Sequence, residues 1–64
     1  MVKKLPISIL KNYPSRTACL KVIHKNQPVL WFINADPKKD NEKTLKKHVK
    51  IYFPNAILIG WAIK

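Results

Sequence analysis

Residues that favour β-strands gather in two stretches of the first half of the chain. Arg16–His24 reads RTACLKVIH, and Pro28–Asn34 reads PVLWFIN with its proline at the first position, where a strand tolerates it. The residues between them, Lys25–Gln27, predict a hairpin loop. A shorter apolar run, Leu5–Leu10, predicts an edge strand, and Asn12–Ser15 predicts the turn that follows it. The first half of the chain therefore predicts antiparallel strands.

A helical period follows the second strand. Asp36 is suited to cap the helix and Pro37 to occupy its first position, while Asp40 is the alternative cap. The helix should end by Phe53, because Pro54 disfavours helical geometry in the residue before it.

The predicted helix is amphipathic. Its apolar face recurs at i, i+3, i+4 and i+7 and consists of Leu45, His48, Val49 and Tyr52. Its opposite face is almost purely lysine and consists of Lys39, Lys43, Lys46, Lys47 and Lys50. A solvated helix surface explains such a face in part. Solvated faces usually alternate Glu with Lys, however, so this one points to a bound partner.

The last stretch, Asn55–Lys64, predicts a final strand that is apolar on both faces. Strict alternation places Ile57, Ile59, Trp61 and Ile63 on one face and Ala56, Leu58, Gly60 and Ala62 on the other. One helix covers only one face of a small sheet, so a homodimer or a contact with a larger partner is expected to cover the other. The candidate interface residues are Trp31, Ile57, Ile59, Trp61 and Ile63. Two alternatives stay open: residues 1–14 fold back across that face, or both tryptophans belong to the core.

The order of elements predicts a small α+β fold. Residues 1–64 are expected to form a single β-β-α-β domain, with an extra amino-terminal edge strand as an option. The sheet would have three or four strands and one amphipathic helix packed on one face.

Charge adds a partner class to this picture. Twelve lysines and one arginine oppose only Asp36, Asp40 and Glu42, for a net charge of +10. AT-rich coding explains frequent lysine but not scarce acids, since Asp and Glu codons tolerate the same bias. A polyanionic partner explains both. Three more basic residues, on or beside the predicted hairpin, would extend the lysine face: Arg16, Lys21 and Lys25.

These features predict a non-enzymatic, low-specificity nucleic-acid-binding protein that contacts phosphates. A single arginine gives little scope for base readout, although an exposed Trp31 or Tyr13 would stack on unpaired bases. The alternative is a small protein-binding module or inhibitor, of the kind that phages and mobile elements carry, docking on an acidic surface of a larger host protein.

The parts for catalysis or metal binding are scarce. Cys19, His24 and His48 match no zinc spacing, and one glycine cannot form a phosphate-binding loop. We therefore predict no catalytic residue, no metal and no cofactor. A lone cysteine favours the cytoplasm, and the longest apolar run, residues 56–63, is too short to span a membrane.

Overall fold

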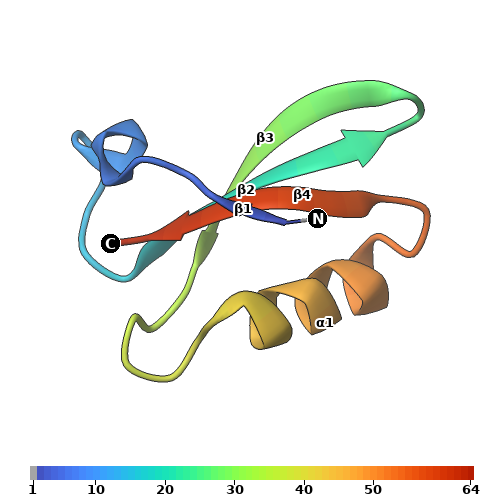
Figure 1. The fold of residues 1–64 in the computed structure, drawn as a ribbon. Coiled ribbons are helices and arrows are strands. Elements are labelled where there is room, and N and C mark those ends of the chain that lie inside the picture. The colour runs from blue at the N-terminus through green and yellow to red at the C-terminus, as the bar shows by residue number, and fades with distance from the viewer. Residues whose placement is uncertain (1) are drawn as a thin grey trace.

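The computed structural model describes residues 2–64, and these form a four-stranded sheet with one helix packed against it (Figure 1). In chain order the elements are β1 Lys3–Lys4, the 3-10 helix η1 Ile7–Leu10, β2 Thr17–His24, β3 Gln27–Asn34, α1 Glu42–Tyr52 and β4 Ile57–Ile63. The predicted α+β fold, with its extra amino-terminal strand, is confirmed.

The strands lie in the order β1-β4-β2-β3, so β2 and β4 are central and β1 and β3 form the two edges. β2 pairs antiparallel with both β3 and β4, whereas β1 pairs parallel with β4. The turn between β2 and β3 consists of Lys25 and Asn26, whose φ angles are 54° and 63°. Two residues at positive φ form the type I′ turn, whose twist matches that of a hairpin.

The main core lies between the sheet and α1. Its buried members are Ala18, Leu20, Val22, Ala35, Leu45, Val49 and Leu58. Even-numbered residues of β2 face the helix, and Trp31 and Trp61 lie directly beside Leu20 on the neighbouring strands. Both tryptophans pack against this core, as do Ile33 and Ile63. The alternative that the tryptophans are core residues is therefore confirmed.

The strict alternation predicted for the last strand is wrong, because β4 contains a β-bulge. Lys21 lies opposite Gly60, yet Val22 lies opposite Leu58, so Ile59 is an extra residue. The bulge changes the phase of the strand. Leu58 consequently joins Trp61 on the helix side, and Ile57 is left 64% exposed on the other side.

The amino-terminal segment covers part of the second sheet face. Leu10, Cys19 and Ala62 form a second buried cluster, against which Leu5 and Ile9 pack. Leu5 crosses so close above Gly60 that a Cβ there would lie 2.9 Å from the Leu5 Cδ2 atom. The alternative that residues 1–14 fold across this face is thus correct for the cluster around Cys19. Met1 lies outside the described residues.

The strand predicted for Leu5–Leu10 is wrong in position. The edge strand is Lys3–Lys4, and Ile7–Leu10 forms η1 instead. The chain has to leave the sheet edge after β1 in order to cross the second face. A 3-10 turn after Pro6 allows this, with the amide of Ile9 donating to the Pro6 carbonyl at 3.2 Å, and it buries the Leu10 side chain completely.

The helix starts later than either predicted cap. Asn41 caps it, since its Oδ1 accepts from the Thr44 amide at 3.1 Å, and Thr44 Oγ1 accepts from the Asn41 amide at 2.9 Å. This reciprocal pair satisfies amides at the start of α1. Asp36 and Asp40 instead stabilise the preceding turn, where Asp40 Oδ2 accepts from the Asp36 amide at 2.8 Å. The predicted end by Phe53 is confirmed.

Candidate nucleic-acid interface

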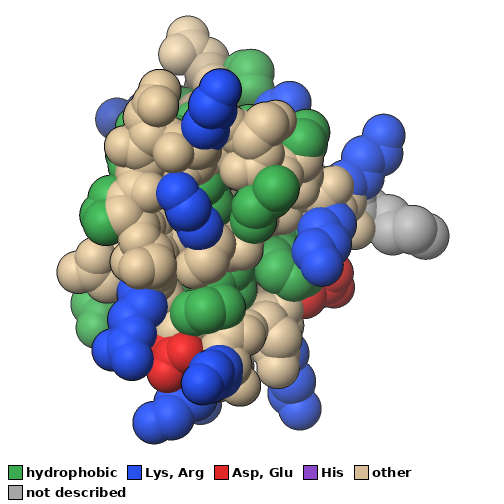
Figure 2. Space-filling view, turned by 90° about the vertical axis from the view of Figure 1, so that its left-hand side faces the viewer, with side chains coloured by type: hydrophobic (Ala, Val, Ile, Leu, Met, Phe, Trp, Pro, Cys, Tyr) green, Lys and Arg blue, Asp and Glu red, His purple; other side chains and the backbone are tan. Residues whose placement is uncertain are grey.

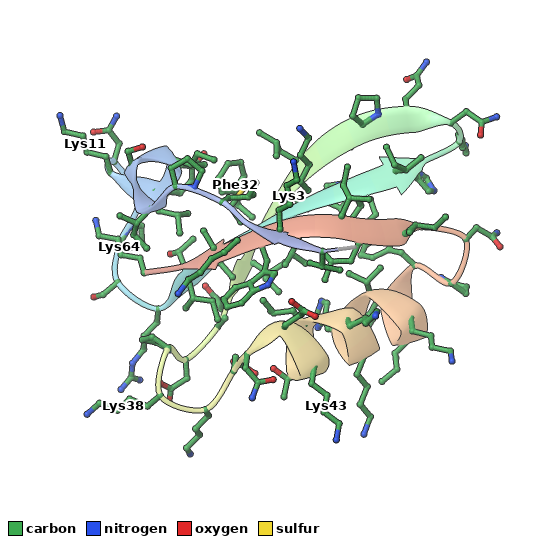
Figure 3. The ribbon with its side chains drawn as sticks, in the orientation of Figure 1. Lys3, Lys11, Phe32, Lys38, Lys43 and Lys64 are labelled. Carbon is green, nitrogen blue, oxygen red and sulfur yellow. The ribbon has the colours of Figure 1, made fainter. Side chains whose placement is uncertain are left out.

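Four exposed lysines lie on α1 outside its buried stripe, and we call them the helix lysines. They are Lys43, Lys46, Lys47 and Lys50, and all four are exposed. Leu45 and Val49, on the opposite side of α1, are each only 2% exposed, and this burial fixes the rotation of the helix. Figure 3 shows Lys43 directed away from the sheet. The buried apolar stripe thus leaves the helix lysines exposed together, with Lys46 and Lys50 bordering a hollow between α1 and β4 that Leu58 also lines.

The loop before α1 adds two cations next to this surface. Lys39, expected on the helix itself, lies in the turn that precedes it, because the helix begins at Glu42. Lys38 was not among the sequence candidates, although it adjoins Lys39, and it is exposed on the helix side of the molecule (Figure 3). Both flank the amino-terminal end of the helix lysines.

The three carboxylates gather at that same end and accept hydrogen bonds from N–H groups. Asp36 Oδ1 accepts from the Lys38 amide at 2.9 Å, and Asp40 accepts from the Asp36 amide as described above. Glu42 Oε1 lies 3.4 Å from the indole nitrogen of Trp61. Residues 46–50, which carry Lys46, Lys47 and Lys50, include no acidic residue.

Two of the three basic residues expected to extend the patch, Lys21 and Lys25, do not join it, whereas Arg16 lies near the loop before α1. Lys21 lies half-buried on the sheet face away from α1, and Lys25 lies in the hairpin turn. Arg16 lies at the opposite end of that hairpin and lines a shallow hollow with Asp36 and Asp40. Figure 2, a view onto one end of the molecule, shows blue side chains spread over the surface with small, isolated acidic areas among them.

Two other lysines have structural partners. The ammonium group of Lys64 donates to the carbonyl oxygens of Leu10, Lys11 and Tyr13 at 3.2, 3.3 and 2.9 Å. The Nζ atom of Lys4 lies 5.5 Å from the centre of the Trp61 ring, within the range of a cation–π contact. Lys4 and Lys64 therefore differ from the helix lysines, since their cations contact groups of the same chain.

The aromatic residues predicted as stacking platforms already have partners. Tyr13 stacks on Phe32 with ring centroids 4.3 Å apart and planes 7° apart, and Trp31 lies 4.0 Å from the Phe53 ring. Tyr13 and Phe32 lie on the sheet face away from the helix lysines. Trp31 lies on the helix side, at the edge strand β3. An unpaired base held by the helix lysines would not reach Tyr13, because the sheet lies between them.

The titratable groups outside this surface do not form a reactive cluster. Cys19 is buried on one face of the sheet, whereas His24 follows the core residues on the other face and His48 lies on α1. Burial raises the pKa of the Cys19 thiol above its ordinary value of 9.0 and keeps it neutral. Within residues 2–64 no group of three His, Cys, Asp or Glu side chains is placed to hold a metal ion, and no helix is long and apolar enough to cross a membrane.

Comparisons with protein-family models, with curated proteins and with solved structures found no match to this chain.

Proposed function

We propose that this protein binds nucleic acid without catalysis and with low sequence specificity, by contacting phosphates through the helix lysines. The observation that carries the proposal is the segregation of four exposed lysines on the outer side of α1, with every acidic residue confined to the segment at or before its first turn. Lys38 and Lys39 extend the contact at one end.

The arrangement costs the helix some stability. Lys43 and Lys47, and likewise Lys46 and Lys50, are like charges one turn apart, and each such pair destabilises an exposed helix by a few tenths of a kcal/mol. A bound polyanion makes the electrostatic contribution of these lysines favourable, since each lysine is then attracted to phosphates of a common partner. Counterions released from the nucleic acid then supply the favourable free energy.

The structure favours recognition of the backbone over recognition of bases. The single arginine lines a hollow with Asp36 and Asp40 and is not among the helix lysines, so at most one side chain suited to read guanine lies at the edge of the proposed surface. The tryptophans pack against the core. Lysines on a convex helix provide point charges that match phosphates without selecting a sequence.

The salt dependence of binding to a duplex of random sequence tests the proposal. With four to five lysines on phosphates, log K should fall with log salt at a slope of about −3.6 to −4.5 for each bound chain. Replacing Lys43, Lys46, Lys47 and Lys50 with glutamine should abolish binding, because it removes the contacts, and leave the far-ultraviolet circular dichroism unchanged.

A matched variant separates the surface from the net charge. Replacing Lys3, Lys11, Lys21 and Lys25 with glutamine removes the same charge from outside α1 and should retain most of the affinity. Equal losses in the two variants would show that net charge alone attracts nucleic acid. Absence of binding at low salt, with a protein complex that survives nuclease treatment, would replace the proposal with docking on an acidic protein surface.

A further inference from the structure

The two edges of the sheet differ in how they are protected against pairing with another strand. β1 is two residues long, and both residues are exposed lysines. Short, lysine-bearing edges resist association. β3 is eight residues long, reads QPVLWFIN and carries no charge, although lysine makes up almost a fifth of the chain. Among residues 2–64, β3 pairs with β2 alone, so its outer edge is open.

The register shows which backbone groups point outward from β3. The two-residue turn makes His24 and Gln27 a hydrogen-bonded pair, and such pairs recur at every second residue, as the bond from the Ala35 amide to the Arg16 carbonyl confirms. Trp31 and Ile33 therefore bond to β2. The outward groups belong to the residues between them: Pro28, Leu30, Phe32 and Asn34. Only Pro28 lacks the amide hydrogen, so the edge retains most of its donors.

Aromatic and apolar side chains border this edge on both faces. Leu30, Phe32 and Tyr13 lie on the face away from α1, exposed by 46%, 39% and 38%. On the helix side, Trp31 contacts Phe53, which is 39% exposed. Four of the chain's six aromatic residues thus lie along β3. Aromatic enrichment with depletion of lysine is the composition of a protein interface.

We propose that β3 pairs antiparallel with β3 of a second copy of this chain, which joins the two sheets into one. The pairing places Leu30 of each copy opposite Phe32 of the other and makes about six hydrogen bonds between the two edges. An antiparallel two-fold pairing of one strand with itself is self-complementary, as a symmetric dimer requires.

Charge complementarity points to a second copy as the occupant. All three acidic residues of the chain lie in residues 36–42, just beyond the end of β3, while Lys25 lies in the turn just before its start. With Leu30 opposite Phe32, Asn26 of one copy is level with Asp36 of the other. Each end of the joined edge then brings Lys25 of one copy to residues 36–42 of its partner, where Lys38 and Lys39 accompany the three acidic residues and the net charge is −1.

The proposal differs from the interface expected from the sequence. Ile57, Ile59, Trp61 and Ile63 lie on β4, a central strand, and take no part in it. Trp31 does take part, because the two-fold axis passes between the Trp31 residues of the two copies.

Amide hydrogen exchange on the unmodified protein tests the pairing. The amides of Leu30 and Phe32 should exchange rapidly in dilute solution and become protected as concentration rises, in step with a sedimentation mass approaching twice the 7.5 kDa of one chain. The amides of Trp31 and Ile33 should be protected throughout. A mass of one chain at every concentration and salt would overturn the proposal. A dimer in which Leu30 and Phe32 stay unprotected would also do so.

A pair of variants locates the interface independently. Leu30→Lys places a charge on the open edge and should shift the dimer to monomer by at least tenfold in the dissociation constant. Ile57→Lys adds the same charge at a residue that is 64% exposed on the same sheet face but away from β3, and should leave the constant unchanged. Equal effects of the two substitutions, or a larger effect at Ile57, would contradict pairing through β3. Neither readout requires nucleic acid, so the outcome is independent of the proposed function.

Discussion

The lysines of this molecule have different roles, and the role of each depends on which groups its ammonium group contacts. Lys64 extends back to η1 and donates to three carbonyl oxygens of the short helix and its following turn, those of Leu10, Lys11 and Tyr13. Lys43 reaches solvent beyond the outer side of α1. Net charge counts these two lysines equally, whereas stability and binding do not.

Replacement of Lys64 should therefore reduce stability. Lys64→Met keeps the unbranched stem but removes the donor, and we expect a loss of about 1 kcal/mol in the free energy of unfolding, because hydrogen bonds from a charged group are lost at a partly exposed site. Urea unfolding measures the loss. Lys11→Met, a change of the same charge at a neighbouring exposed residue, should stay within about 0.5 kcal/mol of the parent. Equal effects would mean that the carbonyl contacts of Lys64 contribute nothing.

At the scale of elements, burial of the core-facing side stabilises α1, whereas repulsion among the lysines on its outer side destabilises the helix. Lys43→Glu in its first turn converts repulsion from Lys46 and Lys47 into attraction and complements the helix dipole. The free energy of unfolding should rise by about 0.5 to 1 kcal/mol. Affinity for duplex DNA should fall by about tenfold at low salt, because a phosphate contact becomes a repulsion.

Opposite changes in stability and affinity are the signature of a surface maintained for binding. Thermal unfolding and a titration with labelled duplex measure the two quantities on the same variant. Lys11→Glu, with the same change of charge away from α1, serves as the control and should change the affinity less. If Lys43→Glu stabilises the protein and leaves the affinity unchanged, the outer side of α1 is only a solvated face.

Local sequence patterns predict the two strands of the hairpin, the helix and the last strand. They do not predict where each element starts or which residues of β4 face the helix. Residues of β2 and β3 have the branched and aromatic side chains of strands, and Pro54 marks a helix end, so these elements were predictable. The bulge at Ile59 depends on pairing with Lys21 and Val22, which are far from Ile59 in the sequence. The cap also escaped prediction, because Asp36, Asp40 and Asn41 are all suitable caps and only the turn geometry selects Asn41.

The candidate site was predictable to a similar extent. The helix lysines follow from the helical period alone. Lys21 and Lys25 were assigned to the same patch because a sequence does not show on which side of the sheet a hairpin residue lies. Tyr13 and Phe32 stack through a contact between segments 19 residues apart, which no local pattern indicates.

At the scale of the whole molecule, one property of the proposed dimer follows from its symmetry. A two-fold axis perpendicular to the joined sheet keeps both helices on the same face. Because each helix contacts β4, about five strand spacings, or about 24 Å, would separate the two sets of helix lysines. The dimer would therefore present two lysine surfaces in one direction.

Salt should move the two proposed associations in opposite directions. Two copies that each carry +10 repel at long range, and this repulsion falls as the Debye length shortens from about 10 Å at 0.1 M to about 3 Å at 1 M salt. The dimer should thus tighten with added salt, while binding to nucleic acid weakens. Sedimentation and duplex titration across the same salt series measure both. A dimer that weakens in parallel with duplex binding would contradict this expectation.

The turn at Lys25 and Asn26 also has a consequence for the order of events in folding. It joins β2 to β3 through contacts close in sequence, whereas β4 can pair with β2 only after the chain has closed a much longer loop through α1. The hairpin is thus expected to form before the rate-limiting transition state is crossed. Asn26→Gly, which relieves a positive φ of 63°, should speed refolding in a stopped-flow experiment and leave the unfolding rate nearly unchanged.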